Sequence, residues 1–233
     1  MNHRLDVLKA NKKIISEGLS RLTWGNVSVI DEGRDKIYIK PSGADLDKIH
    51  YEDISVVSMS GDALSGMKPS VDTNTHLLIY ENFKNVGAIV HTHSKFATVF
   101  AQSNLSIPCF GTTHADYFYG DIPVVYDPNP LLLDTAYEKA VGESIVEYFN
   151  DNNLKPLFVP ACLCPGHGVF TWGRDLNDAV NNAIIAELVA EMAYHTISLR
   201  SSSGKDVNKA VDKKILDKHF LRKHGEKKYY GQR

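Results

Sequence analysis

The stretch Val86-Gly-Ala-Ile-Val90, followed directly by His91-Thr-His93-Ser94, decides both the expected fold and the expected chemistry of this chain. The apolar run is short, rich in β-branched residues and bounded by polar residues, so it predicts a buried strand. Side chains alternate along a strand, which puts His91 and His93 on one face with their Cα atoms roughly 6–7 Å apart. Two imidazoles at that spacing can bind one metal ion, but a catalytic zinc site needs at least one further protein ligand and an open position.

Helices and strands alternate on both sides of this segment. Apolar spacing predicts helices at about 5–19, 72–82, 95–102, 131–149 and 177–199. Further strands are predicted at about 27–30, 36–39, 54–58, 122–126 and 157–164. This mixture predicts a layered α/β domain, and the short connection between the first two strands indicates a sheet that is not wholly parallel.

Length and composition are those of one large globular domain. The chain has 233 residues, enough for a substantial core, and its 43% hydrophobic and 23% charged residues are typical of a soluble protein. No apolar run approaches the ~18 residues of a membrane span, so we expect no membrane association. The N-terminus lacks a basic-then-apolar signal pattern, and the three cysteines are an odd number. Both features predict reduced thiols and a cytoplasmic location.

The net charge of −2 conceals an asymmetry between the C-terminal tail and the rest of the chain. Residues 205–233 contain ten Lys or Arg against four Asp or Glu, a balance of +6, whereas the remainder has 16 against 24, a balance of −8. A basic tail can bind a nucleic acid, an acidic neighbour or a phosphorylated ligand. A solvated helix face is the simpler alternative.

A third histidine and one carboxylate extend the candidate metal site. His167 lies between glycines just after the predicted strand at 157–164, where backbone can approach a ligand closely. Cys162 and Cys164 on that strand offer an alternative, softer site together with His167, although buried strand cysteines are commonly core residues. Asp72 is a candidate anionic ligand, with a helix-capping role as its alternative.

Four polar segments are candidate binding or proton-transfer loops. The turns Thr23-Trp-Gly-Asn26, Lys40-Pro-Ser-Gly43 and Lys68-Pro-Ser70 combine free backbone N–H groups, hydroxyls or lysines, which suits a phosphate. Each is also compatible with a plain turn. The segment 111–120 is dense in groups that can exchange protons, as loops with acid/base residues often are: His114, Asp116, Tyr117 and Tyr119.

In their order along the chain these motifs resemble those of the class II sugar-phosphate aldolases and epimerases. The matching strings are Thr23-Trp-Gly-Asn-Val-Ser28, Lys40-Pro-Ser-Gly43, Pro69-Ser-Val-Asp-Thr73, His91-Thr-His-Ser94, Gly111-Thr-Thr-His-Ala-Asp-Tyr-Phe-Tyr-Gly120 and His167-Gly168. The string at 111–120 and the tail strings Leu216-Asp-Lys-His-Phe-Leu-Arg-Lys-His-Gly225 and Tyr229-Tyr-Gly-Gln232 are most similar to the epimerase branch. Two departures are Val71, where relatives usually have Ser, and Pro165-Gly-His167, where they usually have His-Ser-His.

The resemblance implies a fold, an assembly and a set of site residues. The implied fold is a three-layer α/β/α sandwich with a mixed, largely antiparallel central sheet, in a single domain over residues 1–233. The implied assembly is a homotetramer with active sites between subunits, in which the tail at 205–233 completes a neighbouring site. The implied Zn²⁺ ligands are Asp72, His91, His93 and His167, and the implied phosphate-binding residues are Gly25, Asn26, Ser42, Gly43, Ser70 and Val71, with Lys40 nearby. The implied acid/base pair is Asp116 and Tyr230, with Tyr230 donated by the adjacent subunit and His219 as a helper.

The implied activity is zinc-dependent epimerisation of L-ribulose 5-phosphate, a phosphorylated ketopentose, at C4 to give D-xylulose 5-phosphate. The hydrogen on C4 is not acidic, because the carbonyl is two carbons away. Retro-aldol cleavage, rotation of the aldehyde and aldol recombination are therefore expected instead of direct deprotonation. Breakdown of arabinose or of ascorbate would both fit this reaction.

Two other functions remain as alternatives at the level of sequence. A sugar-phosphate aldolase on the same scaffold would release its aldehyde product. A nucleic-acid-binding or partner-binding protein would use the basic tail around a structural zinc. The isoelectric point near 6.5, and the absence of a basic stripe with interleaved aromatics outside the tail, predict no nucleic-acid partner.

Overall fold

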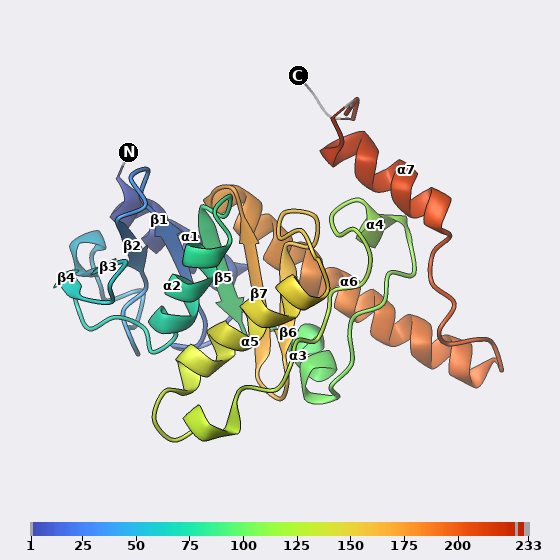
Figure 1. Cartoon of the computed structure of the whole chain (residues 1–233), viewed down its shortest axis with the longest axis horizontal. Coiled ribbons are helices and arrows are strands. Elements are labelled where there is room, and N and C mark those ends of the chain that lie inside the picture. Colours follow the sequence, from blue (N-terminus) through green and yellow to red (C-terminus); the bar gives the residue numbers. More distant parts are fainter. Residues whose placement is uncertain (1, 227, 231–233) are drawn as a thin grey trace.

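A seven-stranded sheet lies at the centre of the computed structural model, which describes residues 2–226 and 228–230 (Figure 1). Within this part of the chain the strand order is β4-β3-β2-β1-β5-β7-β6. All six neighbouring pairs are antiparallel, and one isolated parallel bridge joins Val124 to Leu163. The strands are β1 (Asn26–Ile30), β2 (Lys36–Ile39), β3 (Ser55–Ser58), β4 (Ala63–Ser65), β5 (Ala88–Thr92), β6 (Ala161–Cys164) and β7 (Gly168–Gly173).

Helices cover both faces of the sheet, which confirms the expected three-layer α/β/α sandwich. Helices α2 (Thr73–Asn82) and α5 (Tyr137–Asp151) pack on one face, where Phe170 and Trp172 of β7 enter the core. Helices α1 (His3–Ser16), α3 (Lys95–Gln102) and α6 (Leu176–Ser202) cover the other face, where Val169, the residue before Phe170, enters the core. The alternation along β7 therefore supplies apolar side chains to both layers.

Strand β5 confirms the interpretation of the His-containing segment. It lies between β1 and β7, and all five of its residues are buried. Its register pairs His91 with Asn26 of β1 on one side and with Phe170 of β7 on the other. One central strand therefore brings the first candidate anion-binding turn and the start of β7 to the same end of the sheet.

Three predicted elements differ from the structure. The strand predicted at about 157–164 begins only at Ala161. The segment 122–126 forms only isolated bridges, because Pro123 lacks the N–H that a sheet-interior strand requires. The helix predicted from residue 131 begins at Tyr137, after a short 3-10 turn at Pro130–Leu132. Strands β4 and β7 were not predicted: β4 has only three residues, all of them exposed, and β7 begins and ends with a glycine.

The basic tail contains a docked helix. Helix α7 (Lys213–His224) packs on the short helix α4 (Thr112–Ala115), and it buries Leu216 and Phe220. The Phe220 ring lies 5.0 Å from the rings of both Tyr119 and Phe158. Apolar contacts therefore anchor α7, while its cations remain available for other contacts. Gly231 and Gln232 of the tail string lie outside the described residues. No helix in the described ranges has the length and apolar character needed to cross a bilayer.

Two buried imidazoles predict that the fold is sensitive to acid. His76 is fully buried, with Nδ1 2.7 Å from Ser28 Oγ, and His114 is 4% exposed. Burial lowers the pKa of each imidazole from 6.5 to about 4. At pH 5 both therefore stay neutral in the folded chain, whereas the same side chains take up protons in the unfolded chain.

We expect the free energy of unfolding to fall as the pH falls from 6.5 towards 4, because the unfolded state binds more protons in that window. Each imidazole should contribute a slope of up to about 1.4 kcal/mol per pH unit. Urea unfolding between pH 7.5 and 5 measures the slope. His114→Gln should reduce it, and the control His195→Gln, at an exposed position of α6, should leave it unchanged. Equal slopes in all three proteins would contradict the expectation.

Candidate metal centre and active site

Three histidines meet at the end of the sheet where β5 ends and β7 begins. His91 is in β5, His93 follows it, and His167 lies in the turn between β6 and β7. Their ligand nitrogens all lie within 4.8 Å of one another. The antiparallel pairing of β5 with β7 brings the third histidine to the other two across 74 residues of sequence. The structure thus brings together three of the four residues expected to bind a metal.

The hydrogen bonds of these imidazoles fit a cation. Nδ1 of His91 lies 3.0 Å from the Val169 carbonyl oxygen, to which it donates, so Nε2 carries a lone pair. Nε2 of His93 lies only 3.1 Å from that atom. Two imidazole nitrogens that close need a shared proton or a shared cation between them. The donor set is therefore suited to a divalent metal ion.

The protonation state of the cluster agrees with metal binding. Burial lowers the pKa of His91 to about 3, and it also lowers the pKa of His93 and His167 below the ordinary value. All three are therefore neutral at neutral pH, and neutral imidazole is the form that binds a metal.

Gly168 allows the β7 backbone to approach the histidines. A Cβ atom at this position would lie 2.9 Å from Cδ2 of His93 and 3.4 Å from Cε1 of His91. A larger residue would therefore displace one of the candidate metal ligands.

Asp72 lies beside the cluster but outside it. Its carboxylate oxygens are not among the candidate ligand atoms that all lie within 4.8 Å of one another. It occupies the N-cap position of α2 without a capping hydrogen bond from its side chain, so the helix-cap alternative is not supported. Its carboxylate instead accepts a 2.7 Å hydrogen bond from Asn26 Nδ2. Burial alone would raise the pKa of Asp72, but His91, His76 and His167 and this hydrogen bond hold it below the usual range.

The three candidate anion-binding turns gather next to Asp72. Asn26 Nδ2 donates to Ser70 Oγ at 3.1 Å, the backbone N–H of Ser70 donates to the Lys40 carbonyl at 3.2 Å, and Lys40 Nζ donates to the Thr23 carbonyl at 2.7 Å. The backbone N–H of Ser42 donates to the Lys68 carbonyl at 2.9 Å. Gly25 and Gly43 have φ of +67° and +63°, the left-handed region that glycine adopts readily. Val71 is exposed between Ser70 and Asp72.

Two details of this region were not expected from the sequence. Both hydrogens of the Asn26 amide already have acceptors, Ser70 and Asp72, so its side chain holds other site residues in place. Lys40 is 3% exposed, and burial lowers its pKa while Asp72 opposes that shift. A buried cation beside the three turns favours an anionic ligand there.

Two aromatic residues near the histidines were missed as site residues. The hydroxyl of Tyr137 lies 3.5 Å from Nδ1 of His167. The Trp24 ring, 54% exposed, lies with its centroid 6.4 Å from that of His93. Trp24 was already part of a quoted turn, whereas the sequence around Tyr137 carries no signal that relates it to a histidine 30 residues later.

The three cysteines do not join the metal centre. Cys109, Cys162 and Cys164 are buried free thiols, and the last two belong to the core beneath α2 and α5. Burial raises the pKa of the Cys162 thiol well above its ordinary value, so it stays protonated and is not a thiolate ligand. The alternative soft site with His167 is therefore not formed.

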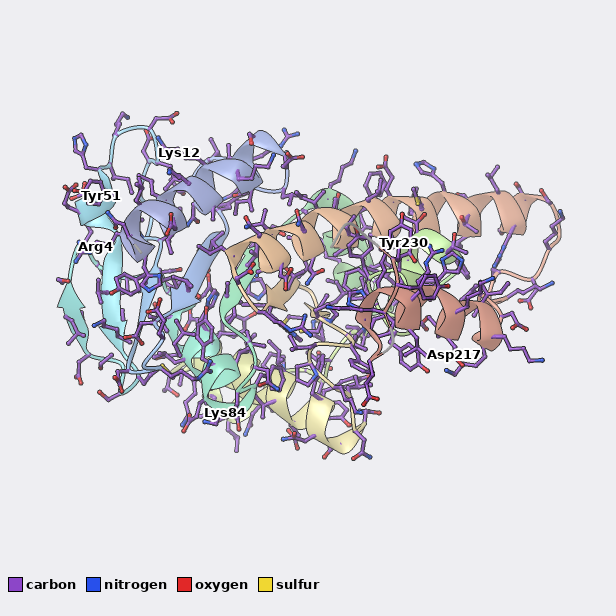
Figure 2. All side chains as sticks on the ribbon, turned by 90° about the horizontal axis from the view of Figure 1, so that it is seen from above. Arg4, Lys12, Tyr51, Lys84, Asp217 and Tyr230 are labelled. Carbon is purple, nitrogen blue, oxygen red and sulfur yellow. The ribbon has the colours of Figure 1, made fainter. Side chains whose placement is uncertain are left out.

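Asp116 and Tyr230 both contact helix α7 of one chain, and Figure 2 shows Tyr230 beside that helix. The Asp116 carboxylate pairs with His219 at 3.1 Å, Arg222 at 3.0 Å and Lys223 at 3.3 Å. Arg222 and Lys223 also lie over the Tyr230 ring, 4.7 and 4.9 Å from its centroid. Burial alone would raise the pKa of Asp116, but these three groups lower it, so the carboxyl is ionised at neutral pH.

Asp116 and Tyr230 are distant from the three histidines of their own chain. In Figure 1, α7 and α4 lie well away from the end of β5. Among residues 2–226 and 228–230, no hydrogen bond, ion pair or ring contact joins Asp116 or Tyr230 to the histidine cluster. The expectation that Tyr230 is donated by the adjacent subunit stays a prediction.

The sequence profile described as Class II Aldolase and Adducin N-terminal domain matches residues 5–194. Among solved structures, an L-fuculose 1-phosphate aldolase has a similar fold, with a TM-score of 0.78 at 23% identity over 97% of this chain and 95% of that chain. A sugar-phosphate aldolase from Thermotoga maritima is 25% identical, with a TM-score of 0.64 over 85% of this chain and 95% of that chain. YgbL from Klebsiella pneumoniae is 25% identical, with a TM-score of 0.68 over 83% and 88%.

Proposed function

Because this chain belongs to the class II aldolase and adducin family, we propose that it is an L-ribulose-5-phosphate 4-epimerase that requires Zn²⁺. The observation that carries the proposal is the placement of three neutral imidazoles next to three anion-binding turns. That placement suits a phosphorylated sugar whose oxygens reach a metal. The tail strings and the Asp116–Tyr230 pair favour an epimerase over an aldolase.

His91, His93 and His167 would hold the metal, with the Asp72 carboxylate close by. Three nitrogen donors with an open position suit a catalytic zinc. When bound, the metal supplies Lewis-acid polarisation of the C2 carbonyl and C3 hydroxyl oxygens of the substrate. The backbone N–H groups of Gly25, Asn26, Gly43 and Val71, with the hydroxyls of Ser42 and Ser70, would bind the phosphate. Lys40 adds a positive charge behind them.

Two proton-transfer groups are needed, one on each side of the aldehyde. Asp116, which is ionised, would take the C4 hydroxyl proton while the C3–C4 bond breaks and its electron pair moves to C3. The product aldehyde, held by its phosphate, turns to present its other face. The C3–C4 bond then re-forms with inverted configuration at C4, and Tyr230 would donate a proton to the new alkoxide. After one turnover Asp116 carries a proton and Tyr230 lacks one, and proton exchange with water would restore both groups. The reverse reaction exchanges the two roles.

We further propose a cytoplasmic homotetramer in which one chain supplies both Asp116 and Tyr230 to the histidine cluster of its neighbour. The support is that Arg222 and Lys223 hold both side chains in one chain, at a distance from that chain's own histidines. The tail at 205–233 would then complete an active site between subunits, within one domain over residues 1–233.

An assay of L-ribulose 5-phosphate conversion, coupled to detection of D-xylulose 5-phosphate, tests the function. We expect conversion by the zinc-loaded protein, with glycolaldehyde phosphate remaining bound. Release of glycolaldehyde phosphate and dihydroxyacetone without epimer formation would show the alternative function, a sugar-phosphate aldolase. If neither D-xylulose 5-phosphate nor the two cleavage products form, the proposal is overturned.

Val71→Ser is expected to lower KM modestly with little change in kcat. The valine side chain is 59% exposed beside Ser70, so an added hydroxyl has room to reach a phosphate oxygen. A hydrogen bond to a charged group contributes about 1.5–3 kcal/mol, and each 1.4 kcal/mol corresponds to about tenfold in affinity. The gain will be smaller if existing donors already saturate the phosphate. The phosphate is remote from the bond that breaks, so kcat should remain nearly unchanged.

Steady-state kinetics of Val71→Ser, with Val99→Ser on α3 as the matched control, would measure this effect. Val99 is also an exposed valine, but it is not among the three turns. A collapse of kcat at constant KM would mean that Val71 supports Asp72 and that the phosphate binds elsewhere.

A further inference from the structure

Tyr137 lies next to His167 at the candidate metal centre, and none of the sequence motifs includes it. It is the first residue of α5, and its ring centroid lies 5.9 Å from that of His167. Its hydroxyl oxygen lies 3.5 Å from Nδ1 of His167. Among the described residues, no other side chain forms a hydrogen bond with that nitrogen. The side chain is half-buried against the core beneath α2 and α5, so the ring is held by packing.

The structure fixes the position of Tyr137 through the contact between α2 and α5. Thr75 Oγ1 donates a 2.5 Å hydrogen bond to the carbonyl of Glu138, the residue after Tyr137. Further along α5, Gly142 lies so close to α2 that an added Cβ would be 3.1 Å from the Thr75 Cα atom and 2.8 Å from Leu78 Cδ1. Helix α2 begins directly after Asp72, so the same contact holds both Asp72 and Tyr137 at the metal centre.

The two deeper histidines have corresponding outer partners. His91 donates from Nδ1 to the Val169 carbonyl and keeps Nε2 for the cluster. His167 has the Tyr137 hydroxyl at its own Nδ1. A histidine that binds a metal generally donates its other ring N–H to an outer acceptor, which fixes the tautomer and the orientation of the ring. For His91 that acceptor is backbone, whereas for His167 it is a side chain.

We propose that Tyr137 is a positioning residue of the metal centre: its hydroxyl oxygen accepts from Nδ1–H of His167 and so keeps Nε2 of that imidazole available to the metal. The proposal rests on the metal site of the proposed function and deepens it. Loss of such an outer partner typically weakens metal affinity by about 10–100-fold.

Zinc affinity measured by competition with a chromophoric chelator tests the proposal without an activity assay. We expect Tyr137→Phe, which removes only the hydroxyl, to bind Zn²⁺ at least about tenfold more weakly than the wild type. The control Tyr148→Phe, on the same helix and against Tyr126, should bind as the wild type does. Circular dichroism and thermal unfolding of the metal-free proteins check that each variant is folded.

A double-mutant cycle shows whether Tyr137 acts through His167. In a His167→Ala background, zinc binds more weakly, and Tyr137→Phe should then have no further effect. If Tyr137→Phe lowers zinc affinity in the His167→Ala background as much as it does in the wild type, Tyr137 does not act through His167. Unchanged affinity in Tyr137→Phe would overturn the proposal itself.

Gly142→Ala offers a second variant should Tyr137→Phe fail to fold. Its Cβ would shift α5 by a few tenths of an ångström, and the 3.5 Å contact is already at the limit of a hydrogen bond. Zinc affinity should fall here too, and an unchanged value would count against the proposal. Failure of the metal site itself is distinguishable, because the wild type would then bind no zinc, or His93→Ala would bind it equally well.

Discussion

His93→Ala is expected to weaken metal binding so far that the purified protein retains little metal, and to abolish most epimerisation. The imidazole supplies one of three ligand nitrogens within 4.8 Å of one another, and two histidines do not make a catalytic zinc site. A Lewis acid contributes several kcal/mol to such a reaction, so activity should fall about a thousandfold or more.

His93 is the informative position of the three. His91 is 1% exposed and stacks on Phe170 with ring centroids 4.1 Å apart, so its replacement would also disturb the core. His93 is exposed and lies just beyond the end of β5. Its removal should therefore cost little stability, and loss of activity can be assigned to the metal.

Elemental analysis and the coupled epimerase assay measure the two effects on one preparation. His195→Ala, an exposed histidine on α6, is the control and should retain both metal and activity. Exhaustive chelation of the wild type should reproduce the loss, and zinc should restore activity. Full activity in protein that contains no metal would contradict the proposal of a metal-dependent enzyme.

Asp116→Asn and Tyr230→Phe are each expected to reduce epimerisation by roughly 10²–10⁴-fold, the usual contribution of a general acid or base. Asp116→Asn also leaves His219, Arg222 and Lys223 without their shared carboxylate, so thermal unfolding must accompany the kinetics. Metal content should remain that of the wild type in both variants, which separates them from His93→Ala.

Mixed oligomers test how the site is shared between chains. If one chain supplies both Asp116 and Tyr230, an Asp116→Asn chain mixed with a Tyr230→Phe chain never gives a site with both groups intact, and no activity returns. An Asp116→Asn chain mixed with a His93→Ala chain gives intact sites at about one quarter of positions in an equal random mixture of a symmetric oligomer.

Recovery in the first mixture would instead support the arrangement expected from sequence, in which the two groups come from different chains. Recovery in neither mixture, with subunit exchange verified, would contradict an active site shared between chains.

The sequence by itself determined the features that depend on local pattern. The β-branched run before His91 predicted β5, and strand alternation predicted that His91 and His93 point to one face. The glycines around His167 marked an accessible loop, and the structure has that histidine in the β6–β7 turn. The mixture of helices and strands predicted the layered fold, because the apolar period of each segment is set by its own residues.

Only the tertiary structure decided which residues far apart in sequence lie in contact with one another. The pairing of β7 with β5 joins His167 to the other two histidines. The approach of α5 to α2 at Gly142 sets Tyr137 against His167. The docking of α7 on α4 brings Tyr230 and Asp116 to the same two cations of α7. These contacts depend on the packing of whole layers, whose apolar surfaces associate without regard to sequence separation, so no local pattern around any one of these residues reports them.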